Sequence, residues 1–254
     1  MSTLIRDYER FAKEANEICK GRVYTDHLRR YAYGVDASCY SYLPKVVVKA
    51  EDEREVRRLI RLCQQCGTPF TFRAAGSSLS GQCSSEDVLI VCNDGFKKME
   101  VIDDGKALKC ECGVIGSDAN DLLKPYNRKI GPDPATLATA LVGGILNNNS
   151  SGMCCGTAQN SYKTIRSIRV VLLDGSILDT SDQKSIDQFL KEKPQMVEDI
   201  LQLRKDILAD EELTHLIHHK YKIKNTTGYG LNSLVDFEDI IDIINHLFIG
   251  SEGT

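Results

Sequence analysis

The chain has 254 residues, of which 42% are hydrophobic and 27% are charged, and its formal net charge is −4. This length and apolar content are enough for a substantial core in one large domain or two smaller lobes. The mild charge and the lack of a basic stripe argue against a nucleic-acid partner, and no apolar run is long enough for a transmembrane segment.

Residues 1–31 are predicted to form an N-terminal helical segment, because apolar residues recur on one helical face. Residues 32–97 are predicted to form a first, small α/β lobe with strands at 44–50, 68–72 and 88–92. A helix between the first two strands opens at Glu51 and ends at Gly67. This strand–helix–strand order implies a right-handed parallel crossover.

Residues 98–254 are predicted to form a second, larger lobe. Hairpins are expected at 99–114 and 165–179, where Asp-Gly turns separate apolar runs. A helix is expected at 117–126, a helix or helix–strand at 240–249, and a polar helical insertion at about 182–221. The predicted fold class is therefore α+β, with a small parallel α/β lobe and a larger lobe whose mainly antiparallel sheet is flanked by helices.

A run of small residues, Arg73-Ala74-Ala75-Gly76-Ser77-Ser78-Leu79-Ser80-Gly81, follows the second predicted strand. Where bulky side chains are lacking, successive backbone N–H groups can turn toward one point and bind phosphate. Arg73 adds a fixed cation and the serines add hydroxyl donors. The segment indicates a pyrophosphate site for a nucleotide cofactor; the alternative is a solvated Gly/Ser turn.

A second small-residue segment runs from Gly131 to Gly156 and is uncharged apart from Asp133. Its backbone can approach a ligand closely, and residues 147–150 supply amide and hydroxyl groups that suit a flat heteroaromatic ring. The alternative is a glycine-rich structural loop. Because two such segments occur in different lobes, we expect them to share one ligand.

In this order, the segments resemble the FAD-binding domain of the vanillyl-alcohol oxidase and p-cresol methylhydroxylase type. They are most similar to the branch of D-lactate dehydrogenase and the glycolate oxidase FAD subunit. The resemblance covers most of the chain from about residue 30 and rests on residues 33–38, 44–48, 73–81, 131–134, 138–139, 143–144, 149–152, 170–175, 225–231 and 250–254.

The resemblance implies non-covalent FAD, since some relatives attach FAD through a histidine beside the first loop and no histidine lies between Phe70 and Cys83. It assigns the pyrophosphate to Arg73, Ala74, Ala75, Gly76, Ser77, Ser78, Leu79 and Ser80. It assigns the rest of the cofactor to Pro132, Asp133, Ala138, Thr139, Gly143, Gly144, Asn147, Asn149, Ser150, Gly152, Gly156 and Tyr229. Ser151, where relatives usually carry glycine, and the polar pair Asn147-Asn148 depart from the family pattern.

The resemblance also implies an FAD-dependent dehydrogenase acting on CH–OH, with hydride transfer from a D-2-hydroxy acid such as lactate or glycolate to flavin N5. Electrons would then pass to an iron–sulfur domain or another electron-acceptor partner. The chain stops within a family motif, at 250–254, so we expect a truncated piece that lacks the cap domain with the substrate site and is inactive alone. No catalytic base is identified. The alternatives are a non-catalytic FAD-binding subunit of a multi-component oxidase and a UDP-N-acetylmuramate-reductase-like flavoenzyme.

The ten cysteines are interpreted as reduced thiols, because the chain is long and the N-terminus lacks the apolar core of a signal peptide. We expect a cytoplasmic location, with peripheral association at the inner membrane face as the alternative. Cys63 and Cys66 are interpreted as buried thiols of a helix, and no metal site is predicted. His215 and His219 share a helical face, for which a solvated helix is the favoured interpretation.

Overall fold

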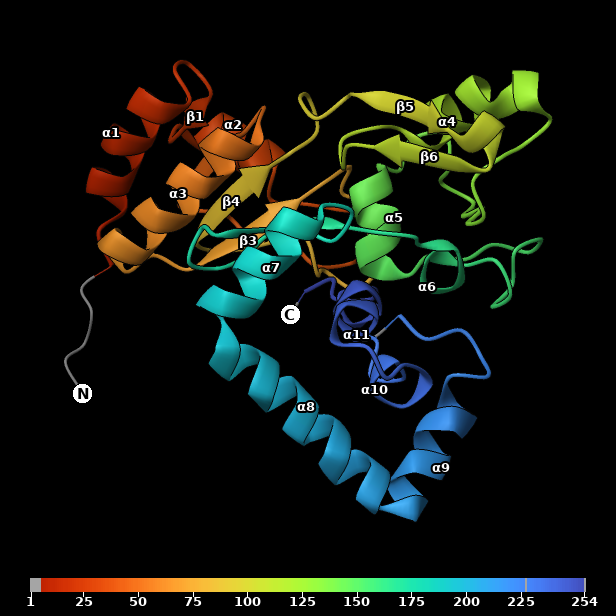
Figure 1. The fold of residues 1–254 in the computed structure, drawn as a ribbon. Helices are drawn as coiled ribbons and strands as arrows, with labels where there is room; N and C mark the ends of the chain where they lie inside the picture. The colour runs from red at the N-terminus through yellow and green to blue at the C-terminus, as the bar shows by residue number, and fades with distance from the viewer. Residues whose placement is uncertain (1–5, 227, 254) are drawn as a thin grey trace.

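The computed structural model describes residues 6–226 and 228–253, and it confirms the α+β class. One group of elements carries the parallel sheet, and a second carries two antiparallel hairpins and most of the helices (Figure 1). The boundary predicted between residues 97 and 98 stays a prediction. The residues 1–5, Thr227 and Thr254 of the predicted segments lie outside the described residues.

The first sheet has the strand order β1-β2-β4-β3. Its strands are β1 (Val23–Tyr24), β2 (Val46–Lys49), β3 (Phe70–Arg73) and β4 (Val88–Val91). β2 and β3 both run parallel to β4, as the sequence predicts, but β4 lies between them. The order follows from burial, since all four residues of β4 are buried and a central strand is covered on both faces.

The N-terminal segment is not helical throughout, which corrects the prediction for residues 1–31. Helices α1 (Tyr8–Ile18) and α2 (His27–Ala32) are separated by β1, which pairs antiparallel with β2. The backbone groups of β1 form hydrogen bonds with β2. The helical periodicity of the side chains could not reveal this pairing.

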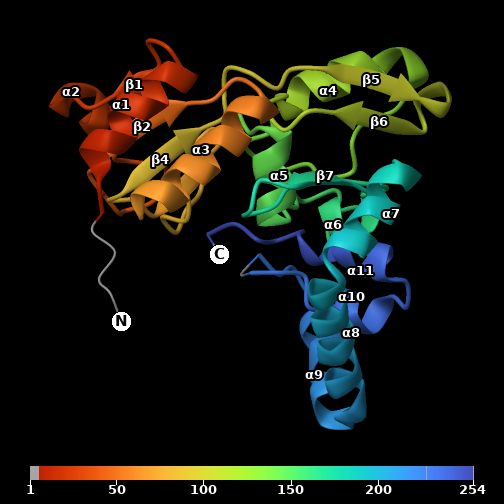
Figure 2. The same ribbon diagram turned by 60° about the vertical axis from the view of Figure 1, so that its left-hand side comes forward.

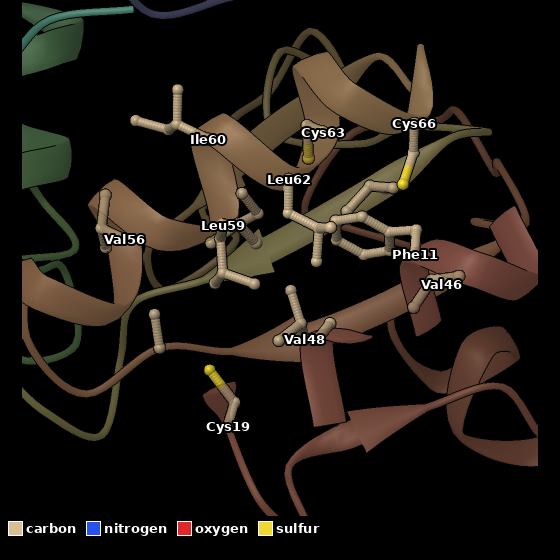
Figure 3. Close-up of a cluster of buried hydrophobic side chains, with 14 residues drawn as sticks. Phe11, Cys19, Val46, Val48, Val56, Leu59, Ile60, Leu62, Cys63 and Cys66 are labelled. Atoms are coloured by element: carbon tan, nitrogen blue, oxygen red, sulfur yellow. The ribbon is translucent and has the colours of Figure 1, made fainter. Parts of the chain in front are cut away.

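Helix α3 (Glu53–Cys66) covers one face of the first sheet. The Asp52 carboxylate accepts a hydrogen bond from the Glu55 N–H at 2.8 Å, and Gly67 ends the helix in the left-handed conformation with φ 63°. The apolar face of α3 packs with α1 and β2 around Phe11, Leu59 and Val48, which are fully buried (Figure 3). This core fixes the strand ends from which the first predicted loop departs.

The second lobe contains two separate antiparallel pairs rather than one extended sheet. β5 (Met99–Ile102) pairs with β6 (Ala107–Cys110), and β7 (Arg169–Val171) pairs with β8 (Ile177–Asp179). Short 3₁₀ turns lie at Asp103–Gly105 and Lys124–Tyr126. Both hairpins form where the Asp-Gly turns predict them.

The remaining helices belong to the second lobe. They are α4 (Gly116–Leu123), α5 (Val142–Asn148), α6 (Ser161–Thr164), α7 (Gln183–Glu192), α8 (Pro194–Ala209), α9 (Glu211–Lys220), α10 (Ser233–Asp236) and α11 (Ile240–Leu247). Helices α7–α9 occupy the range for which a helical insertion was predicted, and α8 and α9 extend away from the body of the molecule in both views (Figures 1 and 2). Ile207 and Ile217 anchor this pair on Leu234 and Ile243.

Helix α5 was not predicted, because its sequence contains Gly143-Gly144 and two asparagines, which are weak helix formers. Ile145 is buried at 2% exposure and holds the helix in place. Asn149 ends it in the left-handed conformation, with φ 51°. Tertiary burial therefore overrides a poor local propensity in the middle of the second predicted cofactor segment.

Candidate functional site: a cleft shared by two small-residue segments

An open cleft of about 3580 Å³ is lined by residues of both lobes. Arg73 and Ala74 of the first predicted segment lie in its wall together with Gly143, Gly144 and Asn147 of the second. A Cβ atom on Gly144 would lie 3.4 Å from the Ala74 Cβ, so the two segments touch. Pro132 and Tyr229 also line the cleft. The two sequence segments therefore face one cavity.

The first segment leaves the sheet where β3 ends, at the carboxyl ends of the parallel strands. Ligands of open parallel sheets bind at this edge. Gly76 has φ +77°, and a Cβ atom there would collide with the Arg73 guanidinium, which folds back over the loop. Arg73 Nη1 donates a hydrogen bond to the Tyr33 carbonyl at 3.1 Å, and its Cζ lies 5.9 Å from the Tyr33 ring centroid. A fixed positive charge thus lies over the loop.

The backbone of this loop presents unused donors. In the described part of the chain, the N–H groups of Ala75, Gly76, Ser77, Leu79 and Ser80 donate to no protein acceptor. The Ser78 N–H faces the Cys83 thiol. Several free amides beside a guanidinium are the donor set that a pyrophosphate needs.

The neighbouring residues 36–38 hold the loop in place through hydrogen bonds. The Ala37 N–H donates to the Gly76 carbonyl at 3.1 Å. The Asp36 carboxylate accepts hydrogen bonds from the Ser38 N–H at 2.8 Å and from the Ser84 hydroxyl at 3.2 Å. Burial opposes the charge on Asp36, but these hydrogen bonds lower the pKa of its carboxyl below the usual range. The charged carboxylate ties residues 36–38 to Ser84, just beyond the end of the loop.

The start of α5 is packed too tightly for side chains. The Gly143 N–H donates to the Cys112 carbonyl at 2.9 Å, and a Cβ atom on Gly143 would lie 2.7 Å from the Cys112 Cβ. Together with the contact between Gly144 and Ala74, this geometry explains the two glycines. It leaves bare backbone at the cleft wall.

Asn149 and Ser150 use their side chains within the second lobe. Asn149 is 7% exposed, its Oδ1 accepts from the Tyr162 N–H at 3.2 Å, and its Nδ2 donates to the Asn225 carbonyl at 3.4 Å. The Ser150 hydroxyl donates to Asn148 Oδ1 at 3.0 Å. These side chains hold the end of α5 against its neighbours and do not line the cleft.

Asp133 and Gly152 organise a turn behind the cleft wall. The Asp133 carboxylate accepts from the N–H groups of Cys154 and Cys155, each at 3.1 Å. Hydrogen bonds from Cys155, and then from Cys154, lower the pKa of Asp133 to about 2. A Cβ atom on Gly152 would collide with the Asp133 carbonyl, so glycine is required there.

Other predicted residues also lie outside the cleft lining, namely residues 75–80 of the first segment and Ala138, Thr139 and Gly156 of the second. Ala138 and Thr139 are exposed, and the Thr139 hydroxyl donates to the Thr136 carbonyl at 3.2 Å. Gly156 has φ +51° with no atom within 4 Å of the place of a Cβ, and Leu79 is 77% exposed. The contacts of Ala138, Thr139, Gly156 and Leu79 with the rest of the protein do not shape the cavity.

Tyr229 lies at the mouth of the cleft and is 42% exposed. Its ring packs edge-on against Phe248 with 6.3 Å between centroids, and its carbonyl accepts from the Tyr221 hydroxyl at 3.1 Å. The sequence reasoning gave no role to Gln82, Cys112 or Glu252, which also line the cleft. Only Glu252 had a signal in the sequence, its place in the late glycine-rich motif at 250–254.

The cysteines and other metal-ligating residues do not gather into a further centre. All ten cysteines are free thiols, and burial raises the pKa of Cys63 to about 12. Across residues 6–226 and 228–253, three or more His, Cys, Asp or Glu side chains nowhere lie close enough together to hold a metal ion. No helix within the same ranges has the length and apolarity required to cross a bilayer.

Comparisons with known proteins agree with this geometry. The chain is 23% identical over 243 residues to D-2-hydroxyglutarate dehydrogenase of Haemophilus influenzae, covering 92% of this chain and 24% of that protein. It is 26% identical over 164 residues to glycolate oxidase subunit GlcD of Bacillus subtilis, covering 62% of this chain and 34% of the relative. The chain thus spans about a quarter to a third of these relatives.

Solved structures share the fold. An alkyldihydroxyacetonephosphate synthase structure matches with a TM-score of 0.58 at 20% identity, over 70% of this chain and 35% of that one. p-Cresol methylhydroxylase matches with a TM-score of 0.56 at 16% identity, over 68% and 35%. The model of one family, the FAD binding domain, matches residues 44–181, which is more than half of the chain, and the chain therefore belongs to the FAD binding domain family.

Proposed function

We propose that the chain binds FAD in the shared cleft, with the pyrophosphate on the loop from Ala74 to Ser80 and the ring system beside Gly143, Gly144 and Tyr229. The observation that carries this assignment is the row of free N–H groups beneath the Arg73 guanidinium. These groups fit a doubly charged diphosphate because they supply donors and positive charge without a competing carboxylate hydrogen bond.

The other predicted residues have supporting roles in this proposal. Asn149, Ser150, Asp133 and Gly152 shape and hold the second segment through the hydrogen bonds and close contacts described above. Pro132 and Asn147 line the cleft directly. A ring between the lobes would therefore meet mostly backbone and small side chains, which bind it by shape and exclude water.

The whole protein is proposed to be a flavin-dependent oxidoreductase that oxidises a D-2-hydroxy acid. Relatives named D-2-hydroxyglutarate dehydrogenase and, in Archaeoglobus fulgidus, D-lactate dehydrogenase support this substrate class. FAD would supply the two-electron acceptor, while the residues described here bind and orient it. Because the chain spans a quarter to a third of these relatives, the substrate site and the proton-accepting base are proposed to lie in sequence beyond these residues.

A second candidate is an FAD-binding subunit that works only with partner chains. The similarity to two proteins named glycolate oxidase subunit GlcD favours it. An iron–sulfur or other electron-acceptor partner belongs to this proposal as well. The ten free thiols support a reducing, cytoplasmic location.

FAD binding is tested by titrating the purified chain with FAD while following flavin fluorescence and visible absorption. The test variant is Gly76→Ala, whose Cβ would displace Arg73 over the loop. The matched control is Gly21→Ala, because Gly21 also has positive φ, +71°, but has no atom within 4 Å of the place of a Cβ. We expect Gly76→Ala to weaken FAD binding by about tenfold or more and Gly21→Ala to leave it nearly unchanged.

A wild-type chain that binds no FAD, or equal affinities for the two variants, would contradict the proposed site. The reaction is tested separately, by adding D-2-hydroxyglutarate, D-lactate or glycolate anaerobically to the natural full-length gene product. Bleaching of the flavin absorption by one of them supports the dehydrogenase. Bleaching that needs a co-purified partner chain favours the subunit.

A further inference from the structure

The segment from Ile249 to Gly253 runs between the two cofactor segments. The Gly250 N–H donates to the Leu146 carbonyl at 3.2 Å, and the Glu252 N–H donates to the Asn147 carbonyl at 2.8 Å. On the other side, a Cβ atom on Gly253 would lie 2.8 Å from the Gln82 Cβ. In Figure 2 the chain runs from α11 back toward α5 and the first sheet.

The Glu252 side chain lies at the centre of this contact. Asn148 Nδ2 donates a hydrogen bond to Glu252 Oε2 at 2.7 Å. The Ser78 hydroxyl, which is hydrogen-bonded to the Gln82 side chain, lies beside the same carboxyl and stabilises its charge. Burial, with the nearby charge of Asp36, raises the pKa of Glu252.

These side chains form one chain of polar contacts from lobe to lobe. It begins at Gln82 and Ser78 in the first lobe, passes through Glu252, and ends at Asn148 and Ser150 in the second. Asn148 belongs to the polar pair that departs from the family pattern, and its amide is the group that binds Glu252. The hydrogen bond between Asn148 and Glu252 and the contact between Glu252 and Ser78 join the two segments at this point.

We propose that Glu252 is a positioning residue that sets the separation of the two segments that contact FAD, by accepting a hydrogen bond from Asn148 on one side and contacting Ser78 on the other. This inference rests on the proposed FAD site. Without the carboxylate, the amide of Asn148 loses its acceptor and the contact with Ser78 is lost, so the spacing of the two segments must be fixed when FAD binds. That ordering lowers affinity.

The test compares Glu252→Ala, Glu252→Gln and the control Glu238→Ala, which removes an exposed carboxylate elsewhere. FAD affinity is measured by fluorescence titration, and the melting temperature is measured for each chain without FAD. We expect Glu252→Ala to weaken FAD binding by about tenfold, since it removes a charged acceptor. Glu252→Gln should recover most of the affinity because its carbonyl can still accept from Asn148, and Glu238→Ala should match the wild type.

A double-mutant cycle with Asn148→Ala separates positioning from general destabilisation. If the two side chains act together, the double variant binds FAD about as weakly as Glu252→Ala alone. Additive losses, or wild-type affinity in Glu252→Ala, would overturn the role of Glu252 while leaving the FAD site intact. Failure of the wild-type chain to bind FAD would instead overturn the proposed function itself.

Discussion

The two walls of the cleft are held by different forces. The first wall rests on a four-stranded sheet whose β2 and β4 are almost entirely buried, with α1 and α3 packed on one face. The second wall, around α5, buries apolar side chains such as Leu141, Ile145 and Ile249, and it is also fixed by hydrogen bonds and tight glycine contacts. The first wall is therefore stabilised mainly by apolar burial. The second wall depends in addition on hydrogen bonds and on close glycine contacts that one added methyl group would disturb.

The largest effect is expected in the core of the first wall. Leu59 is fully buried between α3 and the sheet, and Leu59→Ala should lower the free energy of unfolding by about 2–5 kcal/mol through lost burial and a cavity. Urea unfolding measures this, with Leu28→Ala as the control, because Leu28 is 76% exposed and its loss should cost less than about 0.5 kcal/mol. Similar losses of unfolding free energy for the two variants would show that the burial of Leu59 does not stabilise the first wall.

In the second wall, Gly152→Ala should act mainly on cofactor binding. Its Cβ would collide with the Asp133 carbonyl, so the turn that Asp133 holds must shift. We expect FAD affinity to fall by about tenfold, or about 1.4 kcal/mol, with a smaller change in global stability than Leu59→Ala produces. The comparison variant is Gly156→Ala, in the same turn but with open space around it. Unchanged affinity in Gly152→Ala would show that this turn does not shape the cleft.

The smallest expected effect is a local one on pH dependence. The pKa of Asp133 is lowered from 3.8 to about 2, so its contribution to the turn is complete above about pH 3.8 and is lost as the pH falls through about 2. The amide NMR signals of Cys154 and Cys155 should therefore shift with a midpoint near 2. In Asp133→Asn the same signals should show no such step, and a wild-type midpoint near 3.8 would mean that the hydrogen bonds are absent.

Local sequence patterns predict much of the fold. The apolar face of α3, its Asp52 cap and the glycine at 67 define that helix, and the Asp-Gly turns define both hairpins. The insertion of β4 between β2 and β3 could not be predicted, since periodicity says which residues are strands but not which strands are neighbours. The formation of α5 depends on the burial of Ile145, which is a tertiary property.

The sequence indicates which segments meet at the cleft, but not which of their side chains point into it. Both segments do meet at one cleft, and the family assignment is confirmed. The direction in which Asn149 and Asp133 point could not be read from composition, because a small polar residue serves equally well as a ligand contact or as an internal hydrogen-bond partner. Glu252 was missed for the opposite reason, since its partners come from distant parts of the chain.

The projecting helices α8 and α9 lie apart from the segments proposed to bind the cofactor. Helix α8 has 16 residues, which at 1.5 Å per residue is about 24 Å of length, and the matched family range ends before it, at residue 181. Changes in the number of turns at its far end would alter the molecule's outline without moving the coenzyme-binding backbone. The turn at Asp210 is therefore a suitable place to insert a peptide tag or a reporter.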